Sequence, residues 1–141
     1  MPAFALYVII NEHMETIHVS AEPEGILALT FVGEVNGQTD LDLLKGNIDT
    51  VSKAIKDYHI AQGKRIKVIV NVTDFKAEYI SEAANALAKL AKQDKELVEK
   101  TAVYGGSTKI ILIGETIVAL SGRTNIRFFE NKEKAIKWLN S

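Results

Sequence analysis

The carboxylate with the clearest chemical potential is Asp74, which follows the strongly apolar segment 66–72. An acid at the end of a strand can bind a metal ion, act as a base, or cap a turn. Neither a second carboxylate nor a histidine stands at a motif spacing from Asp74. Capping of a turn is therefore the favoured role, and ligand binding is the alternative.

A second candidate site is the run Gly105-Gly106-Ser107-Thr108-Lys109, which joins a short predicted strand to a predicted helix. Backbone N–H groups at a helix N-terminus attract anions, and Lys109 would add a positive charge. The run lacks the G-x-x-x-x-G-K-[ST] spacing of the phosphate loop, so nucleotide hydrolysis is not supported. The segment either binds an anionic ligand or serves only as a tight connection.

No complete catalytic or metal-binding motif accompanies these candidates. The sequence has no cysteine, which excludes thiolate nucleophiles, thiolate zinc sites and iron–sulfur clusters. His13 and His18 would point to opposite faces of one strand. Arg123 and Arg127 could bind phosphate or carboxylate, but solvated surface or a structural ion pair is favoured. We therefore expect no catalytic residue, no metal site and no cofactor.

The size and charge of the chain bound its class. With 141 residues, 47% of them hydrophobic, the chain is expected to form one domain over residues 1–141. Its 17 Lys+Arg and 18 Asp+Glu give no general attraction for nucleic acid. No apolar run approaches the roughly 20 residues that cross a bilayer. We expect a cytoplasmic protein without stable membrane insertion.

The charges are nevertheless unevenly distributed along the chain. Residues 1–50 carry eight acids and one base, whereas residues 100–141 carry three acids and seven bases. Two differently charged faces could orient a partner, or they could hold the two halves of the domain together. Another protein or a second copy of the chain is the expected partner, and an apolar first strand could pair across a homodimer.

The elements that must position these residues alternate between strands and helices. A helical stripe with spacings of three and four runs from Leu41 to Tyr58; Thr39 is its predicted N-cap and Gly63 its predicted stop. We expect strands near 16–20, 26–32, 66–72, 101–104 and 126–129, helices near 39–63, 80–91, 107–120 and 131–139, and an extra first strand at about 3–11.

This order predicts an α/β fold whose mixed sheet is largely parallel and begins with an antiparallel hairpin. Ligands of open α/β sheets bind beyond the carboxyl ends of the strands. Three such ends would lie on one rim, at residues 33–36, 73–74 and 105–109. A ligand-binding rim is therefore expected at Asp74 and at residues 105–109.

Three strings of the sequence together suggest a family. They are Val68-Ile69-Val70-Asn71-Val72 with Thr73-Asp74-Phe75, Val103-Tyr104-Gly105-Gly106-Ser107, and a closing strand and helix with the pattern F-x-x-x-x-x-A-x-x-W-L from Phe129 to Leu139. In these strings and in its element order the chain resembles the SpoIIAA-like branch of the STAS superfamily, whose members are small bacterial proteins. The resemblance covers roughly residues 14–140 and implies a STAS-like sheet with about four helices packed mainly on one side.

The better-known anti-sigma-factor antagonists of this superfamily are phosphorylated on a serine in an Asp-Ser-Ser-Gly motif. The resemblance places that position at Ser81, where the neighbours are Tyr79, Ile80 and Glu82. Because the Asp, the first Ser and the Gly are missing, a structural role for Ser81 in the first turn of a helix is favoured over phosphorylation.

The sequence thus favours a non-enzymatic STAS-like regulatory or protein-interaction domain of a bacterial cell. The alternative is a carrier of a small apolar or anionic, lipid-like ligand that uses the rim at the carboxyl ends of the strands. A phosphoswitch at Ser81 is the least favoured hypothesis.

Overall fold

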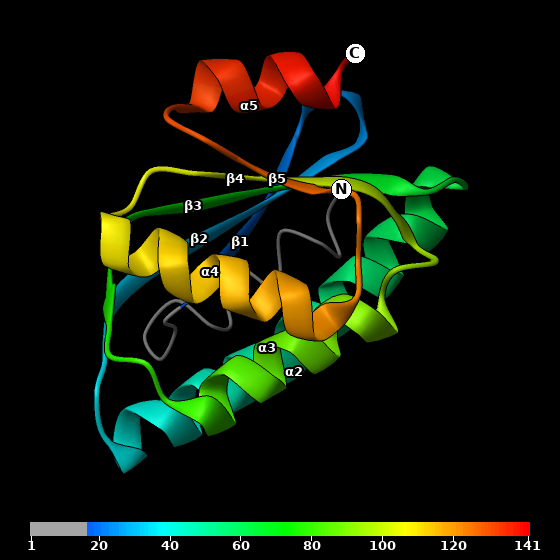
Figure 1. Cartoon of the computed structure of the whole chain (residues 1–141). Coiled ribbons are helices and arrows are strands. Elements are labelled where there is room, and N and C mark those ends of the chain that lie inside the picture. Colours follow the sequence, from blue (N-terminus) through cyan, green and yellow to red (C-terminus); the bar gives the residue numbers. More distant parts are fainter. Residues whose placement is uncertain (1–16) are drawn as a thin grey trace.

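The computed structural model describes residues 17–141, which form one five-stranded sheet flanked by helices (Figure 1). The expected strand at residues 3–11 lies outside the described residues, as does any dimer that it would form. The elements in chain order are β1 (Ile17–Glu22), the 3₁₀ turn η1 (Pro23–Gly25), β2 (Ile26–Val35), α2 (Gln38–Gln62), β3 (Ile66–Ala77), α3 (Ser81–Gln93), β4 (Val98–Tyr104), α4 (Thr108–Ser121), β5 (Ile126–Phe129) and α5 (Lys132–Leu139).

The sheet confirms the predicted topology. Its strand order is β1-β2-β3-β4-β5; β1 pairs antiparallel with β2, and the remaining neighbours are parallel. Helices α2, α3 and α4 cover one face, and α5 covers the other (Figure 1). Each of the three covering helices is the crossover that joins one parallel strand to the next.

The two faces of the sheet explain why β3 begins as an almost continuous apolar run. Val68 and Val70 belong to the core beneath α2, α3 and α4, whereas Ile69 packs with Ala135 and Leu139 of α5. Neighbouring side chains on a strand point to opposite faces, so a strand covered on both sides needs apolar residues at every position.

The sequence predicts the C-terminal end of α2 correctly but not its N-terminal end. Gly63 adopts φ = 69° and ends the helix, as predicted. The predicted N-cap at Thr39 is wrong, because the helix begins at Gln38 after an extended Gly37. Asp40 in the first turn instead accepts a hydrogen bond from the backbone N–H of Asn36 at 3.3 Å.

Strands β2 and β3 run beyond their predicted ends. Val32 to Val35 pair with Asp74 to Ala77 after a register shift that follows the pair Thr30–Asn71. Because β3 advances by three residues where β2 advances by two, β3 carries a bulge at Val72 and Thr73. Phe75 consequently returns to the helix-covered face, where its ring meets that of Phe31 edge-on at 5.3 Å.

The uneven charge distribution has one visible consequence in the described residues. Lys132 of α5 and Glu22 of β1 form an ion pair at 3.2 Å, joining a late base to an early acid. Both side chains are partly exposed, so the pair contributes about 0–1 kcal/mol to stability. This contact corresponds to the alternative in which opposite charges hold the halves of the domain together.

The connection from β4 to α4 depends on two glycines with φ of 80° and 83°. A Cβ on Gly105 would overlap Thr73 Oγ1 and stand 3.1 Å from Thr73 Cα. A Cβ on Gly106 would stand 3.0 Å from Val72 Cγ2 and 3.1 Å from Ile110 Cγ2. The two glycines therefore let α4 begin directly against the β3 bulge.

We expect substitution of these glycines to have opposite consequences from substitution of Gly46. Gly105→Ala should lower the free energy of unfolding by about 2 kcal/mol or more, because it combines a left-handed backbone with a clash. Gly46→Ala is the matched control, since no atom lies within 4 Å of its added Cβ. That variant should gain up to about 1 kcal/mol from helix propensity. Urea unfolding measures both changes, and equal effects would contradict this account.

Candidate functional site

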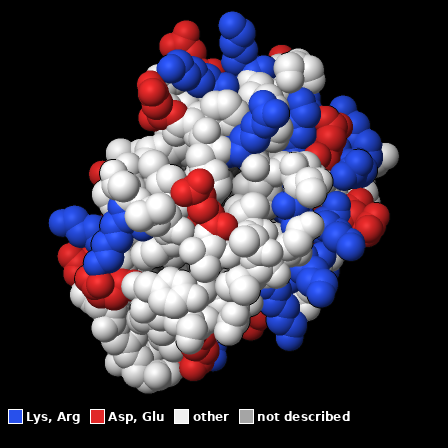
Figure 2. Space-filling model, viewed as in Figure 1, with Lys and Arg blue, Asp and Glu red and all other residues white. Residues whose placement is uncertain are grey.

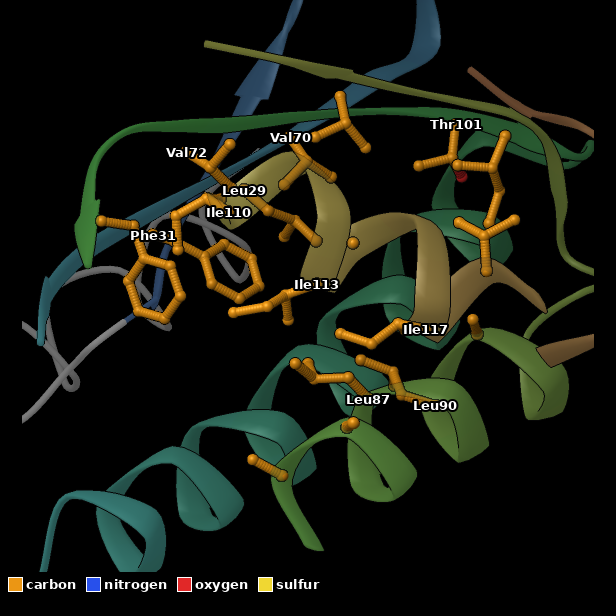
Figure 3. Close-up of a pocket in the computed structure, with 18 of the residues that line it drawn as sticks. Leu29, Phe31, Val70, Val72, Leu87, Leu90, Thr101, Ile110, Ile113 and Ile117 are labelled. Carbon is orange, nitrogen blue, oxygen red and sulfur yellow. The ribbon is translucent and has the colours of Figure 1, made fainter. Parts of the chain in front are cut away.

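An apolar cavity of about 190 Å³, partly open to the surface, lies between the sheet and the helices (Figure 3). Residues from four strands and three helices line it, and nearly all of them are aliphatic or aromatic. Those labelled in Figure 3 are Leu29, Phe31, Val70, Val72, Leu87, Leu90, Thr101, Ile110, Ile113 and Ile117.

Side chains of unequal size line this space. Helix α2 contributes Leu44 and Ile55, and α3 contributes Leu87 and Leu90 as well as three alanines, Ala83, Ala84 and Ala91. A helix held in place at its leucines cannot move closer to the strands at its alanines, where fewer atoms fill the space.

Helix α4 closes the cavity opposite the sheet. Gly114 of α4 lies against β5, where an added Cβ would stand only 2.9 Å from the ring of Phe128. Ile113 and Ile117 lie between α4 and α3, with Ile117 close to Leu87 and Leu90 (Figure 3). Helix α4 therefore approaches β5 closely at Gly114 and lines the cavity with isoleucines such as Ile113 and Ile117.

One end of the cavity is polar. Thr101 lies there in Figure 3, and Asp94 and Arg123 also line the space. Arg123 donates hydrogen bonds from Nε to Asn125 Oδ1 and from Nη2 to Thr101 Oγ1, both at 2.9 Å. Asp94 is 1% exposed, and neither carboxylate oxygen has a hydrogen-bond partner among the described residues.

Burial dominates the electrostatics of this end. Loss of hydration raises the pKa of the Asp94 carboxyl above its ordinary value, and the positive charges of Lys56 and Arg123 offset only part of that rise. Burial likewise lowers the pKa of the Arg123 guanidinium, while the Asp94 carboxylate opposes the change. Asp94 and Arg123 thus face the cavity as groups of opposite charge, and burial disfavours the charged form of each.

The predicted rim is an open depression of about 440 Å³. Ser107 and Lys109 line it, and Lys109 Nζ pairs with Glu78 Oε2 at 2.5 Å. The depression and the apolar cavity share Phe75, Ala77, Glu78 and Ile110 as lining residues. The rim therefore lies against the end of the cavity opposite Asp94 and Arg123.

The structure brings the three predicted strand ends together but not all of their residues. The depression is lined by Glu34 and Asn36 from the first, Thr73 from the second, and Ser107 and Lys109 from the third. Asp74 lies inside β3 rather than after it, and alternation from Phe75 places it on the opposite face of the sheet. Ser107 caps α4 by accepting a hydrogen bond from the backbone N–H of Ile110 at 3.2 Å, and Thr108 is the first helical residue. Of the predicted ligand-binding set, Asp74 and residues 105–109, only Ser107 and Lys109 line the depression.

Ser81 is the exposed first residue of α3, directly after the segment that follows β3. Its neighbour Glu82 forms an ion pair with Lys45 of α2. The structure therefore places Ser81 in the first turn of a helix, where the sequence expected it.

Sequence reasoning missed Asp94 altogether. It stands among Lys92, Gln93, Lys95 and Glu96, a polar run with the composition of a solvated helix end. Its burial follows from long-range packing of the α3–β4 connection, which leaves no local signal. Arg123 was considered only for phosphate, carboxylate or surface roles, whereas it lines the cavity.

The described residues 17–141 contain no cluster of three or more His, Asp or Glu side chains that could hold a metal ion. None of their helices is both long enough and apolar enough to cross a membrane.

Comparisons with known proteins agree with this architecture. The family model described as SpoIIAA-like matches residues 26–140. No curated protein matches the sequence. An uncharacterized protein of the DUF3478 family with a SpoIIAA-like fold, from Shewanella loihica PV-4, superposes with a TM-score of 0.55 at 18% identity, over 87% of this chain and 91% of that chain.

The anti-sigma factor antagonist SpoIIAA in its unphosphorylated form is a second structural neighbour. It superposes with a TM-score of 0.57 at 11% identity, over 88% of this chain and 96% of that chain. At such low identity both neighbours establish the fold alone.

The buried Asp94 predicts an unusual dependence of stability on pH. The folded protein holds the Asp94 proton to a higher pH than the unfolded chain, so its stability falls as pH rises between the two pKa values. Asp94→Asn removes this titration. The free energy of unfolding of wild type, relative to the variant, should fall by at most about 1.4 kcal/mol per pH unit in that interval. Urea unfolding from pH 4 to 8 measures it, and parallel profiles would show that the pKa is not raised.

Proposed function

This chain belongs to the SpoIIAA-like family, and we propose that it is a non-enzymatic binding domain that holds one small apolar molecule between its sheet and helices α3 and α4. The observation that carries the proposal is the cavity of about 190 Å³ with an almost entirely apolar lining. Such a domain would carry or sense its ligand without covalent chemistry.

The size of the cavity limits its occupant. An engineered cavity of about 150 Å³ lined by Leu, Ile and Phe stays dry and binds benzene. A space of about 190 Å³ would accommodate a slightly larger molecule, of about eight non-hydrogen atoms. Burial of the apolar surface of such a ligand, at about 25 cal/mol per Å², would supply the binding free energy.

The rim provides a route for this ligand in the proposal. The depression that Ser107 and Lys109 line adjoins the apolar cavity at Phe75, Ala77 and Ile110. An exposed ion pair between Lys109 and Glu78 stands beside that junction and contributes little to stability. We place entry of the ligand there, and Gly105, Gly106 and Thr108 form the connection that holds Lys109 in position.

A second candidate function is regulation through another protein in the bacterial cytoplasm. The supporting observation is the outer side of α4, where Leu112 is 58% exposed and Leu120 is 51% exposed. Figure 2 shows that the middle of this face of the molecule is largely uncharged apart from one acidic group, and that Lys and Arg lie toward its edges. A phosphoswitch at Ser81 is a weaker variant of this proposal, supported only by the exposed position of that side chain.

Filling the cavity should abolish ligand binding. Val70 points from β3 into the cavity (Figure 3), so Val70→Phe would occupy the space that p-xylene needs. Val32→Phe is the matched control, since alternation places Val32 on the α5 side of the sheet. In NMR titrations, p-xylene should shift cavity methyl resonances in wild type and in Val32→Phe but not in Val70→Phe.

Wild-type protein that leaves these methyl resonances unmoved would contradict the binding function, as would unchanged binding by Val70→Phe. Native mass spectrometry of freshly purified protein supplies an independent check through the mass of any co-purified ligand.

The interaction candidate makes a separate prediction. Leu112→Ser combined with Leu120→Ser should remove the apolar side of α4 without altering the affinity for p-xylene, because neither residue lines the cavity. Cross-links from Lys109 to another protein in living cells should disappear in this double variant. Cross-links that persist unchanged would exclude this side of α4 as the contact surface.

A further inference from the structure

We infer that the molecule held in the cavity carries a neutral hydroxyl group, which donates a hydrogen bond to Asp94 and accepts one from Arg123. This inference rests on the proposed binding function and specifies the class of ligand as small apolar alcohols and phenols. It follows from the polar end of an otherwise apolar space.

The backbone holds Asp94 firmly while leaving its side chain unpaired. Its N–H donates to the carbonyl oxygen of Leu90 at 3.2 Å, and its carbonyl oxygen accepts from the N–H of Leu97 at 2.9 Å. Both carboxylate oxygens lack a hydrogen-bond partner among residues 17–141. A buried, unpaired carboxylate costs stability, so its presence calls for an explanation outside the fold itself.

The nearby cations do not satisfy this carboxylate. Arg123 donates hydrogen bonds from two of its N–H groups to Asn125 and Thr101. Lys56 acts on the Asp94 carboxyl through its charge, and it forms no hydrogen bond with that carboxyl in the described structure. Arg123 influences the Asp94 carboxyl through its charge, yet no hydrogen bond joins the two side chains in the described structure. The Asp94 carboxylate, which is an acceptor, and the Arg123 guanidinium, which is a cationic donor, therefore line the same cavity without a hydrogen bond between them.

The chemistry of these two groups selects the head group. Asp94 requires a donor and Arg123 requires an acceptor, and a hydroxyl group provides both. A carboxylate on the ligand would leave Asp94 without a donor, and an ammonium would leave Arg123 without an acceptor. A neutral hydroxyl group gives each residue a partner and adds no further charge to the buried end of the cavity, so it is the best-fitting group.

Two ligands of equal size test the inference directly. In p-cresol a hydroxyl replaces one methyl group of p-xylene, so the apolar contacts are otherwise nearly the same. Wild type should bind p-cresol at least about tenfold more tightly than p-xylene in calorimetric titrations, as expected for a hydrogen bond to a charged group. Asp94→Leu should lose this preference, whereas the control Asp74→Leu, on the other face of the sheet, should retain it.

A second measurement needs no variant. The ¹³C resonance of the Asp94 carboxyl in wild-type protein should shift on addition of p-cresol and stay in place on addition of p-xylene. This readout holds even if Asp94→Leu fails to fold.

The outcomes separate the two claims. Equal affinities for p-cresol and p-xylene in wild type, or an unmoved Asp94 carboxyl resonance, would overturn the hydroxyl inference and leave the binding function intact. Failure of both ligands to bind would overturn the binding function and, with it, the inference.

Discussion

Helix-to-sheet packing with side chains of unequal size is the constraint on which the rest of this structure depends. On the α5 side, Ala135 and Leu139 pack closely against Ile69 and Ala102. On the other side, three helices cover the sheet, and α3 lines the cavity with alanines as well as with Leu87 and Leu90. The cavity is the volume that this difference leaves, because a helix held by large neighbours cannot move in to fill it.

The connections at the ends of α3 and α4 make one end of that cavity polar. Both helices return the chain to the amino-terminal edge of the sheet, and Asp94 and Arg123 lie in the segments that follow them. The Asp94 carboxylate is buried and has no hydrogen-bond partner among residues 17–141, which destabilises the folded protein. A polar group that destabilises the free protein and lines an apolar space is a feature of binding sites rather than of cores.

Much of the fold could be predicted from local patterns. The order of strands and helices along the chain, the antiparallel start, the helices that begin near residues 107 and 131 and the stop at Gly63 all follow from periodicity and from residues with specific backbone roles. The N-cap of α2 was wrongly predicted at Thr39, because several polar residues at the start of α2 could serve as the cap. The β3 bulge could not be read either, since it arises from pairing with β2 and appears in the sequence only as polar residues after an apolar run.

The candidate site was far less accessible to sequence reasoning. A cavity is a property of distant residues that fail to meet, and no single segment records it. Asp94 looks like any acid at a helix end until the β4 connection buries it. The rim residues were placed by assuming that strands end where apolar runs end, and the extension of β2 and β3 separates Asp74 from Ser107 and Lys109.

The most direct test of the central claim is a crystal structure of the protein under xenon pressure, because xenon enters apolar cavities without needing hydrogen bonds. The account predicts ordered xenon density among Val70, Ile113 and Ile117, between the sheet and α4. Side chains that fill this volume, with xenon density lacking there, would contradict it.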